Sequence, residues 1–190
     1  MAKLKDFHHY KGEDLTPAEK VERAFVEMII NSTVSDDQRV SSKVWEIKHS
    51  SGCCQIARIL AQKRGLNIVM AEVSCLLHDI YVAVEGKGDQ HAVLGAPMAE
   101  KLLNEIGGFE ENQIKTIVKA IAQHSQKDDY SDDPYVEIVK DVDVFDCSLY
   151  LGAENYYKLH KPLMLQHYVK RIQKVRSELG LSPEDTFRYE

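Results

Sequence analysis

The chain has 190 residues, of which 24 are Lys or Arg and 30 are Asp or Glu, giving a formal net charge of −6. This length fits a single domain with its own core, and 44% hydrophobic with 28% charged residues is typical of a globular protein. The apolar stretches fall far short of the roughly 20 residues needed to cross a bilayer, and the charged stretch MAKLKDFHHYKGEDL does not resemble a secretory signal. We therefore expect a cytoplasmic protein without a membrane span, and the acidic balance disfavours broad binding to nucleic acid.

The four cysteines show no CxxC spacing, and two of them are adjacent in a segment with a helical pattern. This arrangement argues against a disulfide framework and against a zinc finger. We interpret them as small apolar residues and assign them no chemistry. They are Cys53, Cys54, Cys75 and Cys147.

Local signals predict three helices in the first half of the chain. The stretch Thr16-Pro17-Ala18-Glu19 combines an N-cap threonine, a proline at the first helical position and a capping-box glutamate, so a helix should begin there. A second helix is predicted over approximately 42–64, ended by Gly65, and a third over approximately 67–83. Each carries an apolar stripe that can face a core, and His49 lies on the stripe of the second.

The second half of the chain shows the same helical periodicity. Asp89 is expected to cap a helix that runs to Ile106 and is stopped by Gly107-Gly108. The other expected helices cover approximately 110–125, a segment after Pro134, and approximately 162–179 beginning with Pro162. Because almost no segment alternates with period two and no linker divides the chain, we expect one all-α domain over residues 1–190.

Several polar side chains fall on otherwise apolar helix faces, where a charge is costly unless it is paired or bound to a metal. Each histidine alone is more often a hydrogen-bonded core residue than a ligand. Together they form a mixed nitrogen and oxygen set suited to a divalent transition ion or magnesium, and the lack of cysteine ligands argues against structural zinc. Adjacent helical residues point about 100° apart, so His78 and Asp79 converge only if their helix presents its edge to the site. The residues are His49, His78, Asp79, His91, His124 and Asp143.

Five segments carry a family resemblance. His49 precedes His78 by 29 residues, His78-Asp79 lies in SCLLHDIY, and Asp143 lies in VKDVDVFD. HAVLGAPMAEKLL and IVKAIAQHS complete the set. In this order they resemble the HD superfamily of metal-dependent phosphohydrolases, in particular its small single-domain bacterial members, whose defining pattern is His, then His-Asp, then a distant Asp. The resemblance covers approximately residues 44–150 and implies an HD-type helical bundle.

Carried over position by position, the resemblance implies that His49, His78, Asp79 and Asp143 bind a divalent ion, with His91 and His124 lining the site. Asp141 and Asp146 match neighbours of the ligand Asp143. The chain departs from the members that act on guanosine alarmones, because Ile80-Tyr81-Val82-Ala83 holds no carboxylate. It also lacks the Gly-Tyr-Pro signature of members that degrade cyclic dinucleotides. The ion stays open among Mn, Co, Mg, Fe and Ni, and its number stays open between one and two.

The resemblance and the ligand chemistry together predict hydrolysis of a phosphorylated small molecule, most simply a nucleotide, by a metal-activated water. Asp79 or a neighbouring imidazole is the candidate proton acceptor, and His91 or His124 the candidate donor or phosphate clamp. The alternative is a non-catalytic helical sensor that binds a metal or a nucleotide. A di-iron carboxylate protein is disfavoured because no Glu-x-x-His pair lies at the inward positions. A homo-oligomer stays open.

Basic residues have two interpretations each. Lys87, between Gly86 and Gly88, and Lys127, just beyond His124, are candidates for contacting a substrate phosphate, although a solvated surface lysine is the commoner case. The basic face of the 162–179 helix is interpreted as a solvated surface rather than a nucleic-acid site. That face consists of Lys170, Arg171, Lys174 and Arg176.

Overall fold

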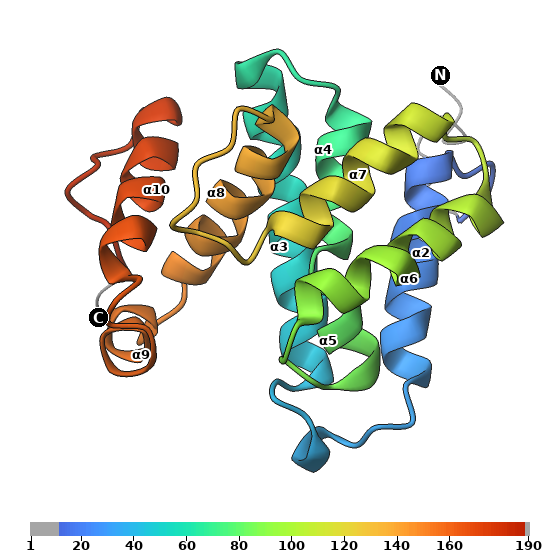
Figure 1. Cartoon of the computed structure of the whole chain (residues 1–190), viewed down its shortest axis with the longest axis horizontal. Coiled ribbons are helices and arrows are strands. Elements are labelled where there is room, and N and C mark those ends of the chain that lie inside the picture. The colour runs from blue at the N-terminus through green and yellow to red at the C-terminus, as the bar shows by residue number, and fades with distance from the viewer. Residues whose placement is uncertain (1–11, 189–190) are drawn as a thin grey trace, which may run out of the picture.

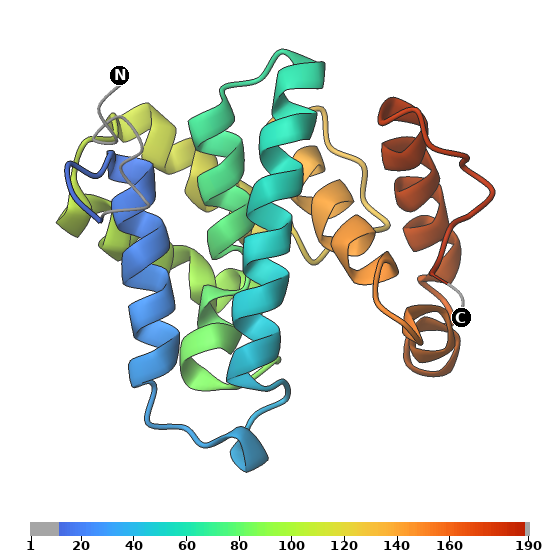
Figure 2. The same ribbon diagram turned by 180° about the vertical axis from the view of Figure 1, so that it is seen from behind.

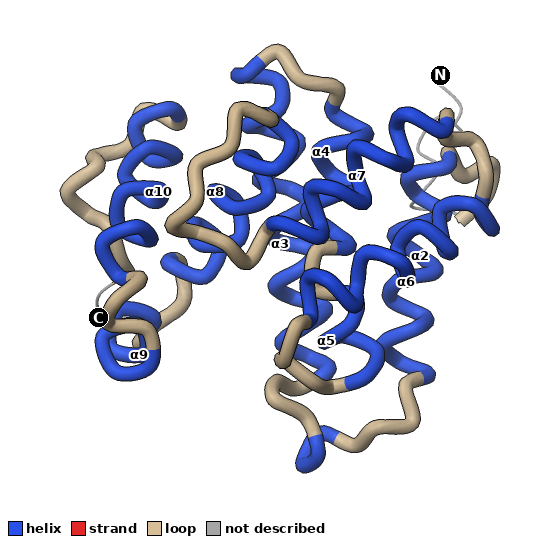
Figure 3. Tube along the Cα trace, in the orientation of Figure 1, coloured by secondary structure: helices blue, strands red, loops and turns tan. Residues whose placement is uncertain are grey.

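The computed structural model describes residues 12–188, and within them the chain is helical with no strand (Figures 1 and 3). The all-α prediction is confirmed. The described residues contain no helix that is long and apolar enough to cross a membrane. The elements are α2 (Pro17–Asn31), the short 3₁₀ helix η2 (Asp36–Gln38), α3 (Lys43–Arg64), α4 (Ile68–Leu77), α5 (Ile80–Glu85), α6 (His91–Ile106), α7 (Glu111–Gln123), α8 (Pro134–Ser148), α9 (Ala153–His160) and α10 (Leu165–Glu178).

The first two long helices begin and end where local chemistry predicts. The Thr16 hydroxyl accepts from the Glu19 amide at 3.3 Å, and the Glu19 carboxylate accepts from the Thr16 amide at 2.8 Å, so the capping box is formed. Ser42 caps α3 by accepting from the Trp45 amide at 3.1 Å. Gly65 ends α3 with a φ of +66°, which favours glycine because other residues rarely adopt it.

Helices α3 and α4 separate two apolar cores (Figure 2). Cys53 and Cys75 face one core with the inner sides of α8 and α10, whereas Cys54 and Leu77 face the other with α2, α6 and α7. Burial of Cys53, Cys54 and Cys75 agrees with their interpretation as small apolar residues, and all four cysteines are free thiols. The pair α3 and α4 is therefore the central wall of the molecule.

Three expectations about boundaries are wrong. The predicted helix 67–83 is two helices, α4 and α5, interrupted at His78 and Asp79. Asp89 does not cap α6; the N-cap is Gln90, in the left-handed region with a φ of +53° and no side-chain cap bond. Pro162 lies in a turn, and α10 begins at Leu165.

The short helix α9 was not predicted from the sequence. Its only buried residue is Tyr157, and most of its other side chains are exposed, so it has almost no apolar stripe to detect. Figure 1 shows it beside the lower end of α10, where the chain turns back from α8.

The basic face of α10 is not a solvated surface at Arg171, whose exposure is only 1%. Its guanidinium donates to Asp141 at 2.7 Å and to Glu137 at 2.7 Å. Asp141, itself fully buried, also pairs with Arg64 at 2.8 Å and with Lys174 at 2.7 Å. The spacing of residues along α10 could not predict the burial of Arg171, because the carboxylates that pair with it lie on α8 and not on its own helix.

Candidate metal centre

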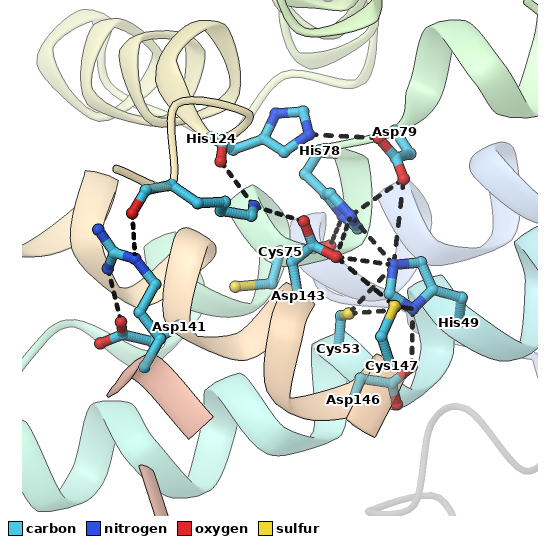
Figure 4. Close-up of polar contacts among 12 residues, drawn as sticks. His49, Cys53, Cys75, His78, Asp79, His124, Asp141, Asp143, Asp146 and Cys147 are labelled. Atoms are coloured by element: carbon cyan, nitrogen blue, oxygen red, sulfur yellow. Dashed lines mark hydrogen bonds and ion pairs between the residues drawn. The ribbon is translucent and has the colours of Figure 1, made fainter. Parts of the chain in front are cut away.

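Four of the predicted site residues converge although they come from three separate parts of the fold (Figure 4). His49 lies on α3, His78 and Asp79 lie at the junction of α4 and α5, and Asp143 lies on α8. The Nε2 atoms of His49 and His78 are 3.2 Å apart. Asp143 Oδ1 is 3.4 Å from His49 Nε2 and 3.9 Å from His78 Nε2, and Asp79 Oδ2 is 3.2 Å from His78 Nε2.

The two remaining histidines meet the other oxygen of Asp79. His91 begins α6 and His124 follows the last turn of α7. Their Nε2 atoms are 3.1 Å apart, and each lies 3.3 Å from Asp79 Oδ1. Asp79 therefore stands between two pairs of imidazoles, with one oxygen toward each. We call these six residues, His49, His78, Asp79, His91, His124 and Asp143, the His-Asp cluster.

The interruption between α4 and α5 explains how two adjacent residues reach one centre. His78 retains helical backbone angles, but Asp79 has a φ of −103° and a ψ of +23°, outside the helix. In a continuous helix their side chains would point about 100° apart. The break places the Asp79 carboxylate beside the His78 ring. The site therefore requires an interruption of the helix at this point, whereas the sequence predicted one continuous helix over 67–83.

Each of the four imidazoles is held by a hydrogen bond from its Nδ1 atom. The acceptors are Cys75 O for His78 at 2.7 Å, Gly88 O for His91 at 2.8 Å, Ile121 O for His124 at 2.7 Å and Asp146 Oδ2 for His49 at 2.7 Å. A carbonyl or carboxylate oxygen only accepts, so these bonds assign the proton to Nδ1. The Nε2 atoms of all four rings consequently point into the cluster, as in histidines that bind metals.

The ionisation states agree with this arrangement. Burial alone would raise the pKa of Asp79 and Asp143, but His78 and His124 around Asp79, and Lys127 beside Asp143, hold both pKa values well below the usual range. Burial lowers the pKa of His124 to about 4, so its ring is neutral at pH 7. Burial also opposes charge on His49 and His78, yet the surrounding acidic groups raise the pKa of both rings, so these two rings bind a proton at Nε2 more readily than a free imidazole and a cation there would displace it. The carboxylates are thus ionised and the centre attracts positive charge.

The donor set fits divalent ions. Asp79 Oδ1 is buried without a hydrogen-bond partner, and it faces two ring nitrogens that carry lone pairs rather than protons. Such an arrangement is repulsive unless a cation lies between the groups. Groups of three ligand atoms within 4.8 Å of one another include Asp79, His91 and His124, and also His78, His124 and Asp143. Imidazole with carboxylate is a ligand combination that suits Mn, Fe, Co, Ni or Zn.

The two candidate phosphate lysines have different surroundings. Lys127 is 4% exposed, so it is not a solvated surface lysine. Its ammonium donates to Asp143 Oδ2 at 2.5 Å and to the His124 carbonyl at 2.6 Å, which holds the second oxygen of Asp143 away from the cluster centre. Lys87 is exposed on the loop after α5 and does not line the cavity beside the cluster.

Sequence reasoning missed two residues that support the cluster. Asp146 was matched only as a neighbour of Asp143, yet it fixes the His49 ring, and Gly52 lies so close that an added Cβ would be 2.1 Å from its Oδ1 atom. Glu46 is 2% exposed, one turn before His49, and accepts a hydrogen bond from Ser41. Burial and the nearby Asp79 carboxylate raise the pKa of Glu46. The sequence did contain a signal for both residues, because Asp146 is three positions after Asp143 and Glu46 is three positions before His49, a spacing that places side chains on the same helix face.

A cavity of about 530 Å³ opens onto the cluster and reaches His49, Asp79 and Asp143. The ring of Trp45 stacks on His49 with centroids 5.6 Å apart and an interplanar angle of 13°. Tyr150 lies against the Trp45 ring at 4.7 Å. The remaining wall consists of Val40, Ser41, Ser42, Cys147, Leu151, Gly152, Ala153, Tyr156 and Tyr157. The cluster is therefore accessible to a small molecule.

Comparisons with known proteins agree with the geometry. Residues 47–147, more than half of the chain, match the HD domain family. Ribonuclease Y of Lawsonia intracellularis (strain PHE/MN1-00) is 28% identical over 135 residues, which are 70% of this chain and 23% of that protein, so the chain spans about a quarter of the relative's length. No solved structure matches the chain. The structure brings the His, His-Asp and Asp residues of the matched segments together in one cluster. The chain belongs to the HD-domain family, whose members are in general metal-dependent phosphohydrolases.

Proposed function

We propose that the protein is a metal-dependent hydrolase of a phosphorylated small molecule, a nucleotide being the expected class. The single observation that carries the proposal is the convergence of four imidazole Nε2 atoms on the carboxylates of Asp79 and Asp143. Three buried imidazoles, a fourth that is partly exposed, and two carboxylates facing them, one with an oxygen that has no hydrogen-bond partner, suit an ion-binding centre better than a structural core.

The arrangement favours two ions. His49, His78 and Asp143 with Asp79 Oδ2 form one group, and His91, His124 and Asp79 Oδ1 form the other. Because its two oxygens face separate ligand groups, Asp79 would help to hold an ion in each group. Lys127 supports the first group, because it neutralises one Asp143 oxygen and leaves the other directed at His49.

Bound divalent ions would neutralise charge on a phosphoryl oxygen and lower the pKa of water. The chain's own groups then orient the reactants. Asp79 and His91 are the best placed to exchange a proton, because their side chains are 19% and 26% exposed whereas His78 is fully buried. Asp79 is the proposed acceptor from the attacking water. If only the ion at His49, His78 and Asp143 is bound, His91 or His124 is the proposed donor to the leaving oxygen; if a second ion is bound, both rings would hold that ion instead. His49 and His78 are held too firmly to do more than bind.

A small phosphorylated molecule suits the site better than a polynucleotide. The name of Ribonuclease Y denotes an enzyme acting on RNA, but the matched region is 23% of that protein. The present chain has a net charge of −6, and a surface that binds RNA is usually basic. The cavity of about 530 Å³ lies within the range of about 300–1,000 Å³ typical of small-molecule sites.

The test combines elemental analysis with a substrate panel. Purified protein is analysed for bound metals, stripped with chelator, reloaded with manganese, cobalt or magnesium, and assayed for phosphate or pyrophosphate release. The panel holds nucleoside mono-, di- and triphosphates, cyclic nucleotides, sugar phosphates and a short RNA. We expect release that chelation abolishes. Bound metal with no release from any compound would contradict the hydrolase and support a metal-binding sensor.

A further inference from the structure

The cavity beside the His-Asp cluster has an aromatic character that the proposed chemistry does not require. Trp45 stands next to the candidate ligand His49, with Tyr150 against it and Tyr156 and Tyr157 farther along the same wall. Hydrolysis of a phosphate needs ions, a water and a proton donor, and none of these uses a tyrosine and tryptophan wall. Aromatic walls next to a reactive centre usually bind a flat ring by stacking.

The rims of the cavity are apolar as well as the wall. Val40 on one side and Leu151 and Tyr156 on the other are 68%, 59% and 54% exposed. The first belongs to the segment between η2 and α3, and the other two belong to the turn and helix α9 that follow α8. Exposed apolar side chains on two opposed segments of one cavity mark a place where a ligand covers them.

The lack of positive charge in the cavity limits how many phosphate groups a ligand can carry. Among the described residues that line it there is no lysine and no arginine, and the imidazole and carboxylates that line it are those of His49, Asp79 and Asp143. Lys127 is already paired with Asp143, and Lys48 lies 5.5 Å from the centre of the Tyr150 ring without lining the cavity. A chain of phosphates extending from the cluster into this cavity would find no cationic side chain to neutralise it.

We infer that the cavity selects a ligand with one phosphoryl group at the His-Asp cluster and an aromatic ring against Trp45, Tyr150 and Tyr156. The inference rests on the proposed function for the position of the phosphoryl group. It narrows the substrate to monophosphate esters with an aromatic part, such as a nucleoside monophosphate, and it places triphosphates outside the preferred class. Trp45, Tyr150 and Tyr156 are then residues that determine specificity.

Binding can be measured without turnover, because carbon–phosphorus bonds are not hydrolysed. Trp45 is the single tryptophan of the chain, so its fluorescence reports directly from the cavity. Magnesium-loaded protein is titrated with benzylphosphonate and with methylphosphonate, which carry the same charged group. We expect a saturable change in emission and roughly 5- to 50-fold tighter binding of the benzyl compound, the range that one stacked ring provides. Equal affinities would overturn the inference.

Two variants and one control locate the ring. Tyr150→Leu and Tyr156→Leu should each weaken benzylphosphonate several-fold and leave methylphosphonate unchanged. The control is Tyr130→Leu, because Tyr130 is 55% exposed, as Tyr156 is, but does not line the cavity. If Tyr150→Leu fails to fold, the exposed Tyr156 still provides the test. Loss of both ligands alike, or an equal loss in the control, would contradict the assignment of the ring site.

A second pair of ligands tests the number of phosphates. With calcium in place of magnesium and at equal free calcium, adenosine 5′-monophosphate should bind at least as tightly as adenosine 5′-triphosphate. Tenfold tighter binding of the triphosphate would overturn this part of the inference. The outcomes also separate from the proposed function: a preference for benzylphosphonate without phosphate release from any compound contradicts only the hydrolase, whereas release from all esters at similar rates with no ring preference contradicts only the present inference.

Discussion

Two aspartates of helix α8, Asp141 and Asp143, are two residues apart and lie in opposite electrostatic surroundings. Asp141 is fully buried and meets three cations, Arg64, Arg171 and Lys174. Asp143 meets one cation, Lys127, and otherwise faces the ring nitrogens of His49 and His78. Figure 4 shows both carboxylates. Arg171 donates to Asp141 and to the carbonyl of Lys127, and the Lys127 ammonium donates to Asp143, so the two carboxylates are connected through these residues.

The difference shows how a buried charged group can be classified. Around Asp141 the carboxylates of Glu137 and Glu178 are matched by neighbouring cations, so the cluster is complete without a ligand and serves to join α3, α8 and α10. In the His-Asp cluster a lysine pairs with Asp143 but not with Asp79, and Oδ1 of Asp79 has no hydrogen-bond partner. A cluster in which every buried carboxylate has a cationic partner indicates a structural role. A cluster that leaves a carboxylate oxygen without a partner indicates a site for a cation.

The largest expected effect is at the incomplete cluster. Asp79→Ala removes the carboxylate that faces both pairs of imidazoles, so we expect loss of tight metal binding and at least about a 1,000-fold loss of phosphate release. Metal content and turnover are measured on the same preparation. The control is Asp132→Ala, an exposed aspartate outside the cluster. Retained metal and near-normal turnover in Asp79→Ala would show that the active site lies elsewhere in the protein.

The complete cluster should respond in stability instead. Asp141→Asn removes the buried carboxylate that pairs with the buried Arg171 and with Arg64, and breaking a buried ion pair costs about 3–5 kcal/mol. Chemical denaturation of metal-free protein is the measurement. In the same assay Asp79→Ala should destabilise the protein less than Asp141→Asn does, because one of the two Asp79 oxygens has no hydrogen-bond partner to lose and the nearest partner of the other is His78 at 3.2 Å. Equal destabilisation by the two variants would break the distinction between the clusters.

A smaller effect is expected from the support of His49. In Gly52→Ala the added methyl group displaces Asp146 and therefore tilts the ring that Asp146 holds. Changes of this kind typically cost 10- to 100-fold in metal affinity or activity, and we expect roughly tenfold here. Competition with a metal-sensitive dye gives the affinity, while far-ultraviolet circular dichroism verifies that α3 is intact. Unchanged affinity would show that Asp146 does not orient His49.

The smallest effect concerns pH. Burial raises the pKa of Glu137, but the hydrogen bond from Arg171 outweighs burial and holds the pKa below its usual 4.5. A carboxyl with a lowered folded-state pKa contributes stability above pH 4.5, and that contribution is lost as the pH falls through the folded value. The difference in unfolding free energy between wild type and Glu137→Gln should therefore shrink below pH 4.5. A constant or growing difference would contradict the role of this pair.

The sequence predicted most of what periodicity and local capping determine. The helices between Thr16 and Ser148, apart from the division of 67–83 into α4 and α5, follow from apolar stripes and cap residues. The grouping of His49, His78, Asp79 and Asp143 was implied by the family resemblance. The assignment of those four as metal ligands stays a prediction. What the sequence did not predict depends on contacts between segments far apart, because burial of Arg171 and Lys127 is decided by carboxylates on another helix.

The aromatic cavity escaped prediction for a related reason. Trp45 and Tyr150 are separated by about a hundred positions and meet only when α3 packs on α8. Helix α9 has one buried residue, so it gives no periodic signal although it supplies part of the cavity wall. No glycine or proline lies at the break between α4 and α5, so no local signal in the sequence indicates that the helix is interrupted at Asp79. Tertiary packing, rather than local preference, forms these features.

Arg171 has a consequence for the order in which the protein is assembled. It donates to the carbonyls of Lys127 and Asp129, so the loop that carries the Asp143 partner is held by a helix that follows every residue of the His-Asp cluster in the chain. During synthesis the ribosome delivers all six cluster side chains before it delivers α10. We expect a nascent chain to capture ions only weakly until α10 has docked, which couples metal loading to completion of the fold.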